Sequence, residues 1–368
     1  MPDPRVPTGN VTGVPQVPGR AVGGAGRRTT GPVTLMDVAR RAGVSLATAS
    51  RALNGGERRV REDLRERVIA AAAELDYAVN TQAQAVARGR SNVVGLLVHD
   101  IADPYFSSIA AGVMRAADEH GLIVTLSTTM RQPEREAGYV ASLRGQRARA
   151  VILAGSRVDD PGLAERLQRE LAAFEATGGR IAVIGQNRLP ADTVLVENRA
   201  TARELAVALA GLGHRRFAVL AGPKRLITAG DRVRGFTEGL ADAGIDLGPD
   251  DVVHGDFTRD GGYETMHALL ARGFDATCVF AVNDVMAVGA MAALREHGVR
   301  LPEEMAVAGF DDIATLRDVT PALTTVRIPL EEIGAAALSL VAQPRAERPR
   351  LRRVPGEVVL RESTARIG

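Results

Sequence analysis

Apolar residues recur at helical spacing near the start of the chain. Between residues 33 and 76, three stretches place them three and four positions apart, which predicts three short helices. Thr34, followed by Asp37, is typical of a capping box at the start of the first helix, and Gly43 predicts its end. Ser45 is a favourable N-cap for a second helix of about eight residues. The pattern therefore predicts a small helical bundle.

The remainder of the chain alternates between strand-like and helix-like patterns. Continuous apolar runs predict strands at 93–98, 122–126, 150–153, 181–184, 217–220, 278–282 and 305–308. Helical periodicity between these runs predicts helices at 107–119, 134–147, 201–212, 231–243, 261–272 and 284–297. Strands that alternate with helices favour parallel sheets with helices on both faces. The number of units predicts two such sheets in two lobes.

The composition is that of an ordinary folded protein. The chain has 368 residues, of which 45% are hydrophobic and 24% charged. No run of eighteen apolar residues and no apolar N-terminal segment occurs, so we expect neither a transmembrane helix nor a secretory signal. Cys278 is the only cysteine, which excludes an intramolecular disulfide. These features favour a cytoplasmic protein without membrane contact.

Charge is unevenly distributed between the two ends of the chain. Residues 1–91 contain 14 Arg against 8 Asp and Glu, whereas the remainder contains 32 basic against 36 acidic residues. A basic head on a mildly acidic body predicts a polyanion, such as nucleic acid, as the partner of the head. Residues 1–32 are rich in Pro and Gly and lack apolar periodicity, which predicts a disordered tail.

A helix, a glycine turn and a second helix form the helix-turn-helix arrangement, whose second helix reads the major groove of DNA. In the stretch GVSLATASRALNG (43–55), small residues predict close packing and close approach to phosphates. Arg51 would project outward, where its guanidinium can bind O6 and N7 of a guanine. Spacing alone leaves open a three-helix bundle without a nucleic-acid role.

Several ordered segments resemble the lactose-repressor (LacI) family of bacterial transcription regulators. They include VTLMDVARRAGVSLATASRALNG, VVGLLVHDIADPYFSSIAAGV and AVNDVMAVGAMAALREHGVRLPEEMAVAGFDDI, and the resemblance covers residues 33–366. It implies a small all-α helix-turn-helix head and an α/β two-lobed, periplasmic-binding-protein-like core with parallel sheets. It also implies a homodimer on double-stranded, near-palindromic operator DNA.

The resemblance assigns the domains as follows. Residues 33–79 are the DNA-binding head, 80–91 a hinge helix, and 92–366 the effector-binding and dimerisation core. Within the core, the N-terminal lobe comprises about 92–195 and 326–344, and the C-terminal lobe about 196–322 and 355–366.

The resemblance also implies DNA-contacting residues. They are Thr34, Ser45, Leu46, Ala47, Thr48, Ser50, Arg51, Asn54, Tyr77, Asn80, Ala83 and Val86. Two positions depart from the family pattern: Val79 replaces a usual Pro, and Val86 replaces the Leu that wedges between base pairs in the minor groove. Because Val is shorter and stiffer than Leu, we expect a shallower wedge.

Polar residues follow the predicted strands of the core, where a pocket between two α/β lobes forms. The candidate effector-binding residues are Asp100, Tyr105, Phe106, Thr228, Arg232, Phe257, Asn283 and Asp311. Hydrogen-bonding groups beside aromatic side chains fit a sugar. The resemblance supports these candidates, because they match effector-binding positions of the family. Leu226 stands where relatives often have a polar residue, which indicates a less polar ligand edge. Glu197 is expected to be structural.

No catalytic constellation occurs in the sequence. There is no P-loop, no nucleophile elbow and no metal-binding spacing of histidines, so we expect neither an enzyme nor a cofactor. The favoured hypothesis is a repressor that loses affinity for its operator when a small molecule binds. A corepressor, which would increase operator affinity instead, is left open. The alternative is a periplasmic-type sugar-binding or sensor protein, against which the basic head and the missing export signal argue.

Overall fold

The computed structural model describes residues 33–54, 60–78 and 91–366. The chain divides into two compact units at residues 80 and 81, and each is described by itself. The predicted tail at 1–32 and the predicted hinge helix at 80–91, apart from Ser91, lie outside the described residues.

The first unit is a three-helix head. Its helices are α1 (Leu35–Ala42), α2 (Leu46–Asn54) and α3 (Glu62–Glu74). The capping box between Thr34 and Asp37 is present, and Gly43, at φ +63°, ends α1 in the left-handed conformation that glycine tolerates. The backbone N–H of Thr48 donates to Ser45 Oγ at 3.1 Å, which caps α2 as the sequence predicts.

Small residues allow the three helices of the head to pack closely. Val38 from α1, Ala49 from α2 and Val68 from α3 are fully buried in one cluster. Arg67 Nη2 donates to the carbonyl oxygen of Ala42 at 2.6 Å, which ties α3 to the end of α1. Arg61, at the N-cap of α3, makes no side-chain capping hydrogen bond.

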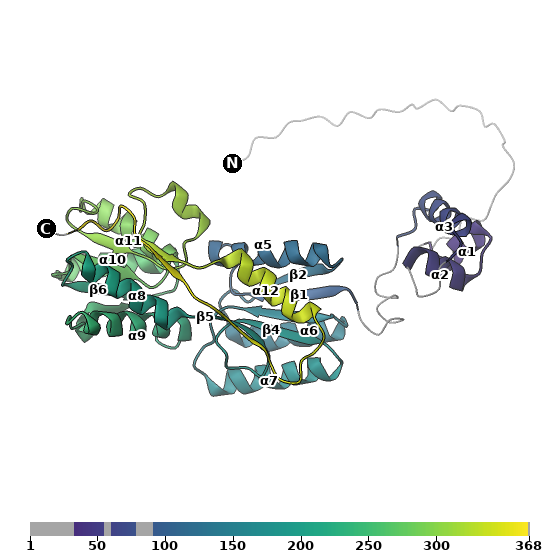
Figure 1. Cartoon of the computed structure of the whole chain (residues 1–368), viewed down its shortest axis with the longest axis horizontal. Coiled ribbons are helices and arrows are strands. Elements are labelled where there is room, and N and C mark those ends of the chain that lie inside the picture. The colour runs from purple at the N-terminus through teal and green to yellow at the C-terminus, as the bar shows by residue number, and fades with distance from the viewer. Residues whose placement is uncertain (1–32, 55–59, 79–90, 367–368) are drawn as a thin grey trace, which may run out of the picture. The chain divides into compact units, whose positions relative to one another are not determined.

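The second unit contains two lobes, and its N-terminal lobe is built on a six-stranded parallel sheet (Figure 1). In the order β11-β5-β4-β3-β1-β2, its strands are Leu351–Val354, Asp192–Val196, Arg180–Gly185, Ala150–Ala154, Val93–Val98 and Ile123–Thr128. Neighbouring residues of β1 face opposite sides, since Leu96 packs in one core cluster and Leu97 in another.

Helices cover both faces of this sheet. Helices α5 (Pro104–Glu119) and α12 (Leu330–Ala342) pack against each other over one face, and α6 (Glu136–Gly145) and α7 (Pro161–Ala176) over the other. A short 3-10 helix, η1 (Pro133–Arg135), precedes α6.

The C-terminal lobe has a four-stranded parallel sheet in the order β7-β6-β8-β9. Its strands are Val252–His254, Phe217–Ala221, Cys278–Ala281 and Ala306–Ala308. The helix pairs that flank it are α8 (Asn198–Gly211) with α9 (Ile227–Asp242), and α10 (Arg259–Arg272) with α11 (Asp284–Glu296) (Figure 1). The 3-10 helix η2 (Pro249–Asp251) precedes β7, and a second 3-10 helix, η3 (Ala314–Asp318), follows β9.

The chain crosses between the lobes near its end. Strand β10 (Thr325–Arg327) pairs antiparallel with β12 (Glu357–Val359), so the outgoing and returning segments run together. Between them, β11 joins the sheet of the N-terminal lobe, although the sequence assigns these residues to neither lobe. Further on, Val307 N donates to Ser363 O, which anchors the returning chain to the C-terminal lobe.

The predicted fold class, a small all-α head and a two-lobed α/β core with parallel sheets, is confirmed. The seven predicted strands are present, whereas β5, β7, β10, β11 and β12 are not among the predicted apolar runs. β11 is the edge strand of its sheet and reads LRRV, with its first three residues exposed, whereas β5 lies between β11 and β4 and reads DTVLV.

Candidate ligand pocket and DNA-binding face

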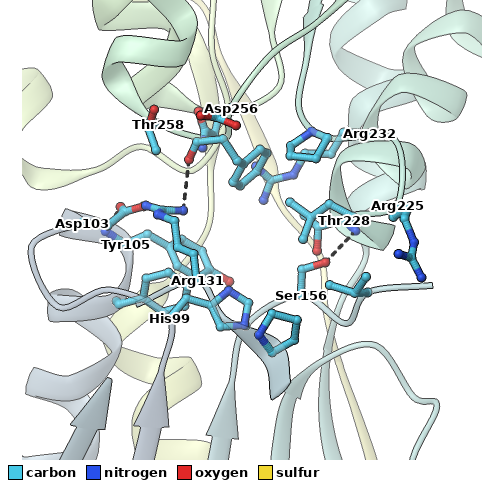
Figure 2. A pocket seen from close by; sticks show the side chains of 18 of the residues that line it. His99, Asp103, Tyr105, Arg131, Ser156, Arg225, Thr228, Arg232, Asp256 and Thr258 are labelled. Atoms are coloured by element: carbon cyan, nitrogen blue, oxygen red, sulfur yellow. Dashed lines mark hydrogen bonds and ion pairs between the residues drawn. The ribbon is translucent and has the colours of Figure 1, made fainter. Parts of the chain in front are cut away.

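A cavity of about 380 Å³ lies between the two lobes of the core (Figure 2). This volume falls in the range of small-molecule sites. Its polar lining consists of His99, Asp103, Arg131, Ser156, Arg225, Thr228, Arg232, Asp256, Thr258, Asn283 and Asp311. Its remaining walls are Tyr105, Phe106, Pro133, Gly155, Val158, Pro223, Leu226 and Phe257. The cavity thus combines apolar surface with a limited set of polar groups, as ligand sites do.

Arg232 forms the base of the pocket and is held on every side. It projects from α9 and is only 2% exposed. Its Nε donates to Asn198 Oδ1 at 2.8 Å, its Nη1 to the carbonyl oxygen of Val282 at 2.7 Å, and its Nη2 to Asp311 Oδ1 at 2.7 Å. The guanidinium also lies 3.9 Å from the centre of the Phe310 ring. This side chain is therefore fixed before any ligand arrives.

Asp311 is held in an uncommon backbone conformation. Its φ is +122°, outside the regions that non-glycine residues usually adopt, and its N–H donates to the carbonyl oxygen of Val326. Burial raises the pKa of this carboxyl to about 6, against the opposing effect of Arg232. Since only Oδ1 has a partner among the described residues, Oδ2 can accept a hydrogen bond from a ligand.

Two neighbouring residues at the start of α11 extend this polar base. Asn283 Oδ1 accepts from Met286 N at 2.9 Å, which leaves its amide NH₂ as a donor in the pocket. Asp284 is fully buried behind it and accepts from Thr325 Oγ1 at 2.6 Å and Ile313 N at 3.0 Å. Burial, followed by repulsion from Asp311, raises the pKa of Asp284 to about 7.

Aromatic side chains form the walls. Tyr105 and Phe106 lie in the first turn of α5 with their ring centres 5.1 Å apart in an edge-to-face arrangement. Asp103 Oδ1 caps this helix by accepting from Tyr105 N at 3.0 Å. Phe257, from the loop after β7, lies on the other lobe. Flat rings on both lobes can stack on the CH face of a ligand ring.

Hydrogen bonds join the lobes across one side of the pocket through Arg131. Its Nη1 donates to the carbonyl oxygen of Phe257 at 3.1 Å, and its Nη2 to Asp103 Oδ2 at 3.2 Å. Arg131 and the preceding Met130 both have positive φ, at +59° and +53°. Two adjacent non-glycine residues in this conformation indicate that the loop is built to aim the Arg131 side chain.

The start of α9 joins the lobes on the other side. Thr228 N donates to Ser156 Oγ at 3.0 Å, and Gln186 Nε2 donates to Thr228 Oγ1 at 2.7 Å. Val158 and Leu226 form an isolated antiparallel bridge next to these contacts. Figure 2 shows Ser156 and Thr228 on one side of the cavity and Arg131 on the other. The structure therefore holds the two lobes in a closed arrangement.

His99 is an uncharged member of the lining. Burial, and after it the nearby Arg157 and Arg131, lowers the pKa of its imidazole to about 3. Its Nε2 lies 3.9 Å from Glu136 Oε1, and Glu136 in turn pairs with the buried Arg157. At neutral pH His99 is thus a neutral hydrogen-bonding group.

Seven of the eight candidate effector residues line this cavity, and Asp100 does not. The Oδ1 atom of Asp100 accepts from Ala102 N at 3.0 Å in the loop before α5. Asp103, three positions later, brings a carboxylate to the wall instead. That the seven contact a ligand stays a prediction.

Sequence reasoning missed other lining residues, notably Arg131, Ser156 and Asp256. Each follows a strand of a parallel sheet, after β2, β3 and β7 respectively, so the rule that sites lie at the carboxyl ends of strands could have found them. This rule does not distinguish Arg131, Ser156 and Asp256, as candidate lining residues, from the other residues of the same loops. Glu197 lies outside the cavity and pairs with Arg353, in line with a structural role.

The predicted DNA-reading residues lie on the exposed face of α2. Leu46 is 47% exposed, and Ala47 and Arg51 are also exposed, whereas Ala49 and Ala52 are buried in the head. Arg51 Nε donates to the carbonyl oxygen of Ala47 at 3.0 Å, which keeps its guanidinium close to the helix surface.

Hydroxyl groups flank this face. Ser45 Oγ and Thr48 Oγ1 lie 2.8 Å apart at the start of α2, and the hydroxyl of Thr34 lies at the start of α1. Ser50 is half-buried, and Tyr77 packs against the core of the head. The side chain of Asn54, and Asn80, Ala83 and Val86, lie outside the described residues.

The part of the chain that the structure describes contains no cluster of three or more His, Cys, Asp or Glu suited to a metal ion. None of its helices combines the length and apolarity needed to span a membrane.

A helix-turn-helix head, followed by a two-lobed α/β core with a cavity between its lobes, is the architecture of a DNA-binding transcriptional regulator. The family model described as bacterial regulatory proteins, lacI family, matches residues 34–80, and that of a periplasmic binding protein-like domain matches residues 206–364. The chain belongs to the LacI family.

Individual relatives are similar to this chain along most of its length. The HTH-type transcriptional regulator GalS of Salmonella typhimurium is 34% identical over 316 residues, covering 84% of this chain and 89% of GalS. Among solved structures, a transcriptional regulator CelR–cellobiose complex is 32% identical with a TM-score of 0.65, covering 90% of this chain and 99% of that one. The lac repressor dimer bound to operator and the anti-inducer ONPF is 29% identical with a TM-score of 0.78, covering 91% and 100%.

Proposed function

We propose that this regulator is a repressor that binds a near-palindromic operator as a homodimer and is released by a sugar bound between its lobes. The observation that carries the ligand assignment is the fixed polar base of Arg232, Asp311 and Asn283, which faces the aromatic walls. A sugar matches this arrangement because its hydroxyls both donate and accept, and its CH face stacks on aromatic rings. The CelR–cellobiose complex supports the sugar class by similarity.

On the DNA side, Arg51 is assigned to one guanine in each half-site, with Leu46 and Ala47 making apolar contacts beside it. Short hydroxyl side chains at Ser45 and Thr48 bind phosphates, which sets the register of the head on DNA. The roles of Asn80, Ala83 and Val86 in the minor groove rest on the family resemblance. Since bacterial operators lie in the cytoplasm, we place the protein there.

Ligand control follows from the cross-cleft contacts. Arg131 and Phe257 O link the lobes on one side, and Ser156 and Thr228 on the other, so a molecule that touches both lobes stabilises their closed arrangement. The ligand changes DNA binding only if the closed arrangement of the core and a more open one differ in operator affinity. The coupling is then reciprocal: the operator changes ligand affinity by the same factor. We propose that the ligand lowers operator affinity and so relieves repression.

The test is a gel-shift titration of the full chain against the DNA upstream of its own gene, with sugars added in turn. The proposal expects a saturable, sequence-specific complex that one sugar dissociates. Binding that depends on salt but not on sequence would contradict the operator assignment. Specific binding that every sugar leaves unchanged, in a panel that also fails to raise the melting temperature, would contradict the ligand assignment.

A further inference from the structure

The cations of the pocket are already neutralised by the protein. Arg232 pairs with Asp311 at 2.7 Å, and Arg131 pairs with Asp103 at 3.2 Å. Both carboxylates line the same cavity. Neither arginine therefore offers an uncompensated charge to a ligand.

Arg225 is the third arginine of the lining, and its charge is also compensated. Its Nη2 lies 2.5 Å from Asp160 Oδ2 and also donates to the carbonyl oxygen of Asp159. Its side chain is 62% exposed, and Figure 2 shows its guanidinium at the edge of the cavity, directed away from the group around Arg232. His99 adds no charge, because burial lowers its pKa to about 3.

Among the charged side chains of the lining, Asp256 is left without a partner of opposite charge within the described residues. It follows β7 beside Phe257, and it is exposed. Within the described ranges, none of the hydrogen bonds or ion pairs involves its carboxylate, whereas the carboxylates of Asp103 and Asp311 each bind an arginine. An unpaired carboxylate can accept hydrogen bonds from hydroxyl or amine groups and repels anions.

From this charge pattern we infer that the pocket selects an uncharged polyhydroxylated ring, a free sugar or glycoside or a nucleoside, and rejects its phosphorylated or carboxylated form. Asp256 is the residue that sets this selectivity. The inference rests on the proposed function, because it concerns the ligand of the same pocket.

Two physical effects produce the discrimination. A phosphate dianion in the cavity meets the unpaired, solvent-exposed carboxylate of Asp256 at short range. To gain a cation, it must also displace Asp103, Asp311 or Asp160 from its arginine and leave that carboxylate without its partner. Hydroxyl groups avoid both effects, because Asp256 and Asp311 Oδ2 accept from them while Asn283 donates.

The experiment measures binding of matched pairs to the full-length protein by calorimetry at about pH 7.5. The probes are glucose, cellobiose, trehalose and adenosine, each with its phosphate monoester. We expect the member that binds to be uncharged, with its phosphate at least about 100-fold weaker. In Asp256→Asn that ratio is expected to fall by about tenfold. Asp246→Asn, an exposed carboxylate outside the lining, serves as the matched control and keeps the full ratio.

The outcomes separate the two claims. If a phosphate ester binds as tightly as its uncharged partner or more tightly, the charge selectivity is overturned while the ligand pocket stands. If Asp256→Asn leaves the ratio unchanged, Asp256 is not its source and the inference fails. If no probe binds in either form, the proposed sugar ligand fails, and the selectivity fails with it.

Discussion

The guanidinium of Arg232 lies 2.7 Å from the carboxylate of Asp311, although 79 positions separate them in the chain and both are buried. Helix α9 supplies the arginine, and the loop after β9 supplies the aspartate, so both belong to the C-terminal lobe. The base of the pocket is thus rigid within one lobe. The N-terminal lobe closes over it with Tyr105, Phe106 and Arg131.

This pair predicts different outcomes for two substitutions. Asp311→Asn keeps the shape and one acceptor, and we expect ligand affinity to fall about 10- to 100-fold because a charged hydrogen-bond acceptor is lost. Operator affinity should change little, since the head is a separate unit. Arg232→Ala leaves Asp311 buried without its partner and is expected to destabilise the core by about 3–5 kcal/mol. Calorimetry and urea unfolding check the two effects. An Arg232→Ala core as stable as the wild type would show that the pair is not structural.

Arg51 is predicted to carry specificity for one base pair. Arg51→Ala should weaken specific operator binding by about 1–3 kcal/mol and relax the preference at a single position in each half-site. Arg65→Ala, an exposed arginine on α3 that pairs with Glu62, is the control for lost charge. Fluorescence anisotropy on an operator and its single-base variants provides the measurement. An equal loss on every sequence would assign Arg51 to the phosphates instead.

Arg131 is predicted to hold the ligand-bound core closed. In Arg131→Asn the residue still tolerates positive φ, but the bond to Phe257 O is lost, so the ligand should dissociate about tenfold faster. The melting temperature without ligand should change little, because the Arg131 side chain is partly exposed. Stopped-flow dissociation measures the rate, with Arg188→Asn, an exposed arginine outside the lining, as control. Identical rates in both variants would rule out a closing role.

Asp284 is predicted to make the stability of the core depend on pH. Its pKa is raised to about 7, above the value of about 3.9 in the unfolded chain. The folded state therefore binds more protons between these values, and its stability falls as pH rises from about 4 to 7 and then levels off. Asp284→Asn removes this contribution, so its urea unfolding free energy should fall less between about pH 5 and pH 8. Parallel curves for the two proteins would show that Asp284 ionises with an ordinary pKa.

Close helix packing predicts opposite effects for two glycines. A Cβ at Gly112 of α5 would overlap the carbonyl oxygen of Glu331, near the start of α12. Gly112→Ala should therefore destabilise the core by about 1–3 kcal/mol. Gly138 is exposed on α6 with open space around its position, so Gly138→Ala should stabilise by about 0.5–1 kcal/mol. Chemical unfolding of both variants decides, and a neutral Gly112→Ala would mean that α5 and α12 separate easily.

The sequence was sufficient for much of this picture. Periodicity located the three head helices and the central strands, because buried strands such as β3 and β8 are continuous apolar runs. It could not locate β11, whose LRRV sequence gains its place only by pairing with β5, a long-range contact. The same limit applies to the site. Arg131 reaches Phe257 across 126 positions, and Asp100 and Asp103 differ in role only through the turn between them.

The central claim is that a ligand in the interlobe pocket controls operator binding. The most direct measurement is operator affinity of the wild type and of Asp311→Asn, by anisotropy, with and without the sugar that raises the melting temperature of the wild type. We predict that the sugar weakens wild-type operator binding at least about tenfold, within the usual range of allosteric coupling. Asp311→Asn should bind the operator normally and ignore the sugar at the same concentration. An equal response of both proteins to the sugar would contradict the claim, because the controlling site would then lie outside this pocket.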